Sequence, residues 1–177
     1  MEIALHVTGA LAYAHDQGVV HGNLSPEKIL IGENEMKISG FGCYAQAAWP
    51  IPRARNELAS VYYIAPEELA QATPTVAGDV YSLAKVLYFM LCGETPHRMT
   101  PDTVPSGLWP FFQKATESDP AARYQDATEA LSELARLRDA PVGDSDSRDE
   151  RGTVAIGEER IVHLEDGEQV VLPEKFV

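Results

Sequence analysis

The stretch VHGNLSPEKIL, residues 20–30, joins two kinds of predicted structure. Before it, residues 2–17 place apolar side chains at helical spacing, which predicts an amphipathic helix that ends at Gly18. After it come two short apolar runs, 29–31 and 36–38, separated by the turn-prone sequence Gly-Glu-Asn-Glu. This pattern is typical of a β-hairpin. The stretch is therefore expected to connect a helix to a hairpin.

Farther along the chain, the pattern is mainly helical. Residues 40–64 show no period and predict a long loop, whereas residues 78–92 are apolar nearly all round, as in a buried central helix. Residues 97–107 contain two prolines and a glycine and predict irregular structure. Two helices are expected around 108–116 and 126–138. The fold class is therefore mainly α.

The stretch at 20–30 resembles the catalytic loop of eukaryotic-type serine/threonine protein kinases, with the bacterial kinase-like proteins most similar. Four other motifs of that family follow in the family's order: KISGFG at 37–42, YIAPE at 63–67, DVYSL at 79–83 and DPAARY at 119–124. The resemblance covers about residues 2–138. It implies a helical C-terminal lobe, with a short β-hairpin at a degenerate catalytic loop and no N-terminal lobe.

Composition divides the chain into three parts. Residues 1–138 form the expected kinase-like lobe. Residues 139–152 are polar, acidic and free of aromatic side chains, which predicts a flexible linker. Residues 153–177 contain β-branched runs, two of them separated by a Glu-Asp-Gly-Glu turn, and predict a small β-hairpin tail. A β-rich C-terminal tail is thus expected beside the helical lobe.

Three positions depart from the family's pattern where its chemistry lies. Asn23 matches the aspartate that accepts the proton of the substrate hydroxyl, and an amide is no base near neutral pH. Lys28 and Gly40 match the two metal-binding residues, and neither supplies an oxygen ligand from its side chain. These degenerate positions predict that no residue of the chain is catalytic, and that no metal is bound.

Five other residues match positions with structural roles in the family. The resemblance places His21 and Phe41 in a hydrophobic stack inside the lobe. It makes Asp79 the residue that holds the backbone of the catalytic loop. It also pairs Glu67 with Arg123, to tie the activation segment to the final helices. A buried pair of this kind fixes geometry more than it adds net stability.

The expected function is that of a catalytically inactive pseudokinase lobe, which acts as a protein-binding or regulatory scaffold. The chain is accordingly expected not to be an enzyme and to need no cofactor. Alternatives are a residual nucleotide-binding domain, with Leu30 under the base as the candidate contact, or a serine/threonine phosphotransferase that needs an N-terminal lobe from another chain. A product without any partner is a further alternative.

Charge and cysteine content narrow the choice of partner. The chain of 177 residues has a formal net charge of -13, which disfavours nucleic acid and anionic membranes as partners. A protein partner is expected, such as an active kinase or another signalling protein. Two cysteines without metal-ligand spacing, and no apolar run long enough to cross a bilayer, predict a cytoplasmic protein.

Overall fold

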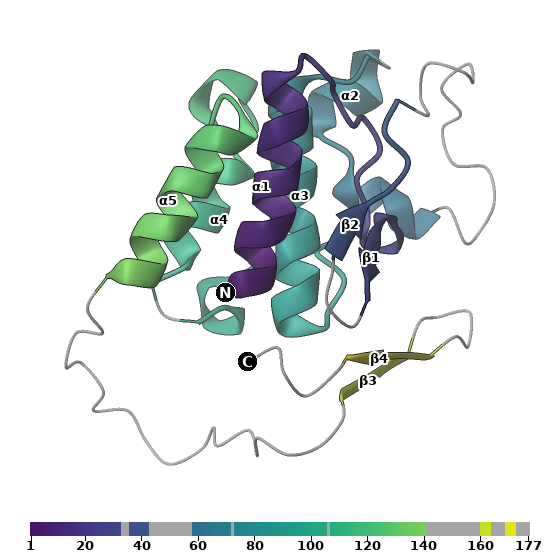
Figure 1. The fold of residues 1–177 in the computed structure, drawn as a ribbon, viewed down its shortest axis with the longest axis vertical. Helices are drawn as coiled ribbons and strands as arrows, with labels where there is room; N and C mark the ends of the chain where they lie inside the picture. The colour runs from purple at the N-terminus through teal and green to yellow at the C-terminus, as the bar shows by residue number, and fades with distance from the viewer. Residues whose placement is uncertain are drawn as a thin grey trace.

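The computed structural model describes residues 1–32, 36–42, 58–71, 73–105, 107–140, 160–163 and 169–172. In Figure 1, helix α1 crosses the middle of the molecule in front of α3, with α4 and α5 on one side and a small β-hairpin on the other. This arrangement is mainly helical with one small two-stranded sheet in the lobe, which confirms that part of the predicted fold class.

The four principal helices lie close to where the sequence predicts them. They are α1 (Glu2–Asp16), α3 (Val76–Cys92), α4 (Trp109–Ala115) and α5 (Ala127–Asp139). Helix α3 starts two residues before the predicted glycine, because the Thr75 hydroxyl caps it by accepting the N–H of Gly78 at 2.9 Å. It ends at Gly93, whose φ of 70° is a left-handed conformation that a glycine adopts without strain.

Both strands of the predicted hairpin are present at the predicted residues. Strand β1 (Ile29–Ile31) pairs antiparallel with β2 (Met36–Ile38), so that Ile29 faces Ile38 and Leu30 faces Lys37. Strand β2 packs against α1. This register places Lys28, the residue before β1, beside Ser39 and Gly40, which follow β2.

Several short helical segments were not expected, and two of them lie between the hairpin and α3. A 3₁₀-helix covers Leu58–Tyr63, inside the segment predicted as a loop, and α2 covers Pro66–Gln71. Both are too short for a helical period to be visible in the sequence. A proline at the first position of α2 favours the helical φ angle there. Residues 43–57 of the predicted loop lie outside the described residues.

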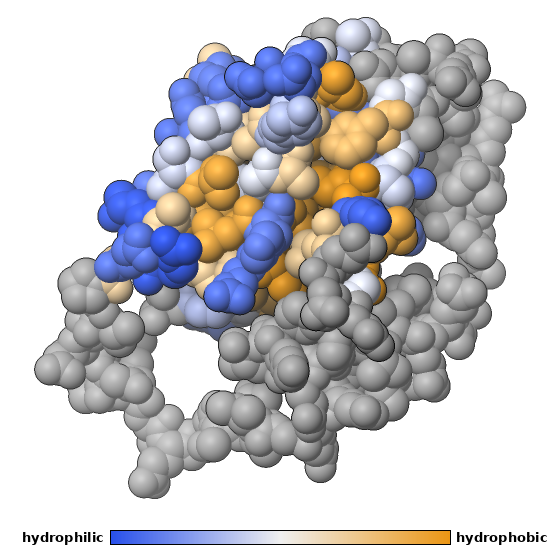
Figure 2. Space-filling model, in the orientation of Figure 1, coloured by the Kyte–Doolittle hydropathy of each residue, from blue (hydrophilic) through white to orange (hydrophobic). Residues whose placement is uncertain are grey.

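The hydrophobic core lies between the four helices, centred on α3. Val80, Leu83 and Leu87 of α3 are almost fully buried, against Leu11 of α1 and Phe112 of α4. Aromatic rings fill the α4 side, where Tyr88 meets Phe112 edge to face at 6.1 Å between ring centroids. On the face shown in Figure 2, hydrophobic residues gather across the middle, whereas hydrophilic residues lie along the α5 edge. The amphipathic helices thus enclose one core.

Two further strands lie near the C-terminus. Strand β3 (Arg160–His163) pairs antiparallel with β4 (Gln169–Leu172), with Val162 opposite Val170. The rest of the predicted linker and tail lies outside the described residues, so the β-rich tail and the three-part division of the chain stay predictions. Among the helices of the described ranges, none is both long enough and apolar enough to cross a membrane.

Glu68 of α2 is a buried carboxyl group at the start of α3. Only 2% of the residue is exposed, and its Oε1 accepts the N–H of Thr75 at 2.8 Å. Burial raises the pKa of Glu68 to about 7, against the hydrogen bonds from Thr75 and with help from the negative charge of Asp79. A Cβ at position 78 would overlap this carboxyl group, so Gly78 is needed for the close approach.

The raised pKa makes the stability of the lobe depend on pH. Protonated Glu68 contributes stability that is fully present below about pH 4.5 and is lost as the pH rises through about 7. Glu68→Gln keeps the acceptor for Thr75 and removes the charge. We expect this variant to match the unmodified chain at pH 5 and to exceed it by about 1–3 kcal/mol in free energy of unfolding at pH 8.

Denaturant unfolding at both pH values measures this difference, with the exposed Glu94→Gln as the control. A gain for Glu68→Gln that is the same at pH 5 and pH 8, or one that Glu94→Gln shares, would contradict the account.

Candidate functional site

The carboxylate of Asp79, in the first turn of α3, holds the loop that resembles a catalytic loop. Asp79 is 1% exposed. Its Oδ2 accepts the backbone N–H of His21 at 2.6 Å, and its Oδ1 accepts that of Gly22 at 2.8 Å. Charged acceptors form short, strong hydrogen bonds of this kind. The two bonds fix the loop backbone on the central helix, which is the contact that the resemblance implied for Asp79.

His15 also binds Asp79, and the sequence reasoning missed it. Its Nε2 lies 3.0 Å from Asp79 Oδ2, and its Nδ1 accepts the backbone N–H of Ala127 at 3.2 Å. The second bond requires a neutral ring with its proton on Nε2, which then donates to Asp79. His15 therefore connects α1, α3 and the start of α5. A single histidine near the end of an amphipathic helix gives no motif that would reveal this role.

His21 and Phe41 stack inside the lobe, as the resemblance implied. Their ring centroids are 4.6 Å apart. The His21 Nε2 donates to the carbonyl of Ser39 at 2.9 Å, and its Nδ1 accepts the N–H of Asn23 at 3.2 Å. Burial lowers the pKa of His21, and the charge of Lys28 lowers it further, against the opposing effects of Ser39 and Asp79. The neutral ring thus joins the loop to the residues after β2.

Asn23 presents its side chain to solvent on this fixed loop. The residue is exposed, while Leu24 beside it is 2% exposed and anchors the loop in the core. The amide of Asn23 can accept or donate a hydrogen bond but cannot take a proton near neutral pH. The position can therefore orient a hydroxyl group, and it offers no base.

The two positions that match metal ligands do not fit Mg²⁺. Lys28 carries an ammonium group and Gly40 carries no side chain, although Mg²⁺ requires oxygen ligands. The two residues are adjacent in space: a Cβ at position 40 would lie 3.3 Å from Cδ and 3.8 Å from Nζ of Lys28. The lysine side chain thus lies where a carboxylate at position 40 would start. No step through a metal ion follows from these residues.

Leu30, the candidate nucleotide contact, lies on the same hairpin. It is 52% exposed on β1, opposite Lys37. It is two residues from Lys28, so an apolar side chain and an ammonium group project from one short segment. The contact of Leu30 with a nucleotide stays a prediction.

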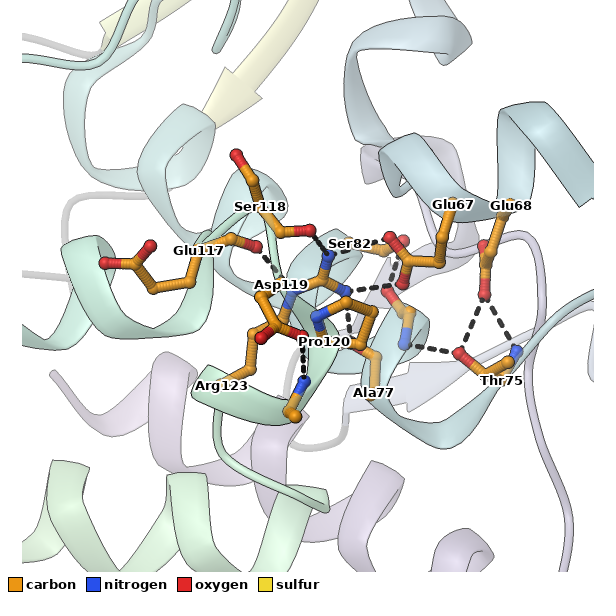
Figure 3. Close-up of polar contacts among 12 residues, drawn as sticks. Glu67, Glu68, Thr75, Ala77, Ser82, Glu117, Ser118, Asp119, Pro120 and Arg123 are labelled. Carbon is orange, nitrogen blue, oxygen red and sulfur yellow. Dashed lines mark hydrogen bonds and ion pairs between the residues drawn. The ribbon is translucent and has the colours of Figure 1, made fainter.

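Glu67 and Arg123 contact each other, as the sequence predicts. The guanidinium group donates from Nη1 and Nη2 to the two carboxylate oxygens of Glu67, each at 2.7 Å (Figure 3). It also donates to the carbonyl of Ala77 at 3.0 Å and from Nε to that of Glu117 at 2.8 Å. Partial burial acts to raise the pKa of Glu67, but the hydrogen bonds and the charge of Arg123, together with a backbone hydrogen bond, lower it overall. The fork geometry binds α2, α3 and the segment before α5 together.

Removing the charge of Asp79 tests whether it holds the loop. In Asp79→Asn, one oxygen is replaced by an N–H donor that faces other donors, so one or two buried hydrogen bonds are lost. Since each buried donor without a partner costs about 1–3 kcal/mol, we expect a loss of about 2–4 kcal/mol in free energy of unfolding. Denaturant unfolding measures it, with the exposed Asp102→Asn as the matched control. A loss under 1 kcal/mol would contradict the role.

Arg123→Ala leaves the Glu67 carboxylate and three carbonyl groups, those of Ala77, Glu117 and Ser118, without this donor. Breaking such a pair typically costs about 3–5 kcal/mol, because one charge is left partly buried and unpaired. We expect a marked fall in melting temperature and in unfolding free energy. Arg98→Ala, at an exposed arginine without an ion pair among the described residues, should change neither. Equal effects of the two substitutions would refute the assignment.

Searches for similar proteins find bacterial serine/threonine protein kinases. The chain is 34% identical over 143 residues to the serine/threonine-protein kinase PknL of Mycobacterium tuberculosis, covering 68% of this chain and 36% of the relative. It is 28% identical over 162 residues to the serine/threonine-protein kinase PrkC of Bacillus subtilis, covering 79% and 25%. A probable serine/threonine-protein kinase of Clostridium perfringens is 29% identical over 163 residues, covering 80% and 24%. The chain thus spans about a quarter to a third of their length.

These relatives correct one expectation. From the side chains at the degenerate positions we expected that the chain is not an enzyme. That expectation is wrong by this comparison, because the relatives over this region are named as protein kinases. The names point to enzyme activity. The expectation rested on side chains at Asn23, Lys28 and Gly40 alone, whereas the likeness to kinases extends over most of the chain.

The family model for the protein kinase domain matches residues 1–134. That range includes the loop at 20–30, the hairpin after it and both anchoring residues, Asp79 and Arg123. The match covers more than half of the chain and agrees with the resemblance read from five motifs. The chain therefore belongs to the protein kinase domain family.

Proposed function

We propose that the chain serves as the protein-binding lobe of a serine/threonine protein kinase, where it receives a basic segment of a substrate or signalling partner. The observation that carries the proposal is the loop at 21–24, which Asp79 fixes through its backbone while Asn23 stays exposed. A loop held in one conformation presents its exposed groups to a ligand at low entropic cost.

Charge supports a basic ligand. The chain has 27 acidic and 14 basic residues. The exposed Glu27 lies in the short 3₁₀-helix Pro26–Lys28 that follows the loop, four residues after Asn23. Complementary charge steers a ligand to its site and discriminates against the wrong ones. A lysine- or arginine-rich segment, such as one from an active kinase or another signalling protein, therefore suits this surface better than an acidic one.

Because the relatives are named as serine/threonine-protein kinases, the proposal includes phosphoryl transfer to a serine or threonine of the bound segment. In that reaction, much of the catalysis comes from positioning and electrostatic stabilisation. The amide of Asn23 would supply positioning, through a hydrogen bond to the hydroxyl of the bound segment. It would not supply a base, so the proton of the hydroxyl would leave to solvent or to the phosphate.

Two further parts of the proposal concern the surroundings of the lobe. The proposed compartment is the cytoplasm, since a reducing environment suits a cysteine thiol such as that of Cys92. The segment 153–177 is proposed to form a small β-element. Its paired strands at 160–163 and 169–172 support this. A two-stranded hairpin is only marginally stable alone in water, so this element would need a further surface to pack on.

Nuclear magnetic resonance of the chain titrated with short serine-containing peptides tests the proposal. We expect a lysine-rich peptide to shift the amide signals of Gly22, Asn23 and Leu24, more weakly as salt is added. A peptide of the same length with glutamate in place of lysine should leave them unchanged. The expected affinity is modest, on the order of 0.1–1 mM, because a short flexible peptide loses entropy when it is ordered.

Asn23→Ala serves as the local variant and Asp102→Asn as the matched control on a distant exposed turn. Loss of the loop shifts in the first and not in the second would support binding at the loop. Shifts spread evenly over the surface, or equal binding of the acidic peptide, would overturn the proposal.

A further inference from the structure

The position of Lys28 indicates a site that the protein-binding proposal does not use. The residue is partly buried, and its side chain lies along Gly40. Hydrogen bonds to its own carbonyl hold the two segments together: Ser39 donates its N–H at 2.9 Å and its hydroxyl at 3.3 Å. The register of β1 and β2 also places Lys28 beside Ser39, since Ile29 faces Ile38. The ammonium group is therefore held at a defined place.

This ammonium group has no ion pair or hydrogen-bonding partner among the residues described. Several other basic side chains do have partners. Arg123 and Arg136 pair with carboxylates, and Lys85 donates to the carbonyl of Pro96 at 2.9 Å. In a chain with a net charge of -13, a partly buried and unpaired cation is unusual. Burying a charge without a partner costs free energy, so such a group is most stable with an anion beside it.

We propose that Lys28 binds a phosphate group of a polyphosphate or nucleotide ligand directly, without a metal ion. The two residues that would hold Mg²⁺ in the family are replaced together: one metal position becomes a cation, and the other loses the side chain that would neutralise it. An ammonium group donates three hydrogen bonds and suits phosphate oxygens. Gly40 carries no carboxylate, so no negative side chain at that position would repel a phosphate oxygen bound to the Lys28 ammonium group beside it.

The charge of Lys28 acts on a residue of the loop at 21–24, which agrees with this placement. It helps to lower the pKa of His21, the ring that joins the loop to Ser39. The ammonium group is thus close to the loop at 21–24 as well as to Gly40. A phosphate bound to it would lie between the fixed loop and the hairpin that carries the exposed Leu30.

Amide spectra of the full chain in buffer with EDTA test the proposal, with tripolyphosphate, ATP and adenosine as probes. We expect tripolyphosphate and ATP to shift the amides of Lys28, Ser39 and Gly40 and adenosine to shift none of them. Equal effects of ATP and tripolyphosphate would assign the site to the phosphate chain, and a larger effect of ATP would add a contact with the nucleoside. Mg²⁺ should weaken binding, because it neutralises the phosphates.

Lys28→Met should weaken binding by about tenfold, the effect of losing a charged hydrogen bond. Lys28→Arg should retain it. The matched control is Lys37→Met, which removes the same charge from the exposed side of the same hairpin. Well-dispersed spectra verify that each variant is folded. Equal losses for Lys28→Met and Lys37→Met, binding only when Mg²⁺ is present, or no shift with any phosphate would each overturn the proposal.

Discussion

The buried carboxylate of Asp79 is the contact on which the loop and three helices depend. A carboxylate away from water requires donors, and it receives them from His21 and Gly22 of the loop and from His15 of α1. His15 in turn accepts the first N–H of α5. One charge therefore fixes the relative placement of α1, α3, α5 and the loop. Because the loop is held by its backbone, its side chains remain free to face solvent.

A second set of contacts meets at the same turn of α3. The Thr75 hydroxyl caps the helix, the carbonyl of Ala77 accepts from Arg123, and Gly78 lies close to the Glu68 carboxyl group. Asp79 follows directly. The first turn of α3 thus connects α2 through Glu68, and it connects the segment before α5 through Arg123. Small residues at 77 and 78 permit these approaches, since a larger side chain at 78 would displace Glu68.

Much of this arrangement could be predicted from the sequence, and the exceptions have physical causes. Apolar patterns located α1 and α5, which each bury one face, and α3, which is buried nearly all round; α4 was also expected near its position. The six-residue α2 was missed, since it is too short to show a period.

His15 was missed for a related reason. Its partners Asp79 and Ala127 are 64 and 112 residues away, and no local pattern marks such contacts. The pair of Glu67 and Arg123 was found only through the resemblance, because 56 residues separate the two. Side-chain identity at Asn23, Lys28 and Gly40 was readable from the sequence, whereas the activity of the family came from comparison.

The contacts that hold the loop are separate from the side chains that matched catalytic positions. This separation explains why the expected kinase-like fold was confirmed, whereas the expectation that the chain is not an enzyme was wrong. Asp79 binds the backbone N–H groups of residues 21 and 22, and a backbone N–H is present whichever residue occupies either position, proline apart. The loop conformation is therefore largely insensitive to what replaces an aspartate at 23 or a metal ligand at 28. Side chains at these positions can vary without loss of the fold, so the motifs stay recognisable. A motif that is recognisable despite altered side chains therefore indicates the backbone fold of the loop. The chemistry of the loop depends on which ligand binds to its exposed side chains.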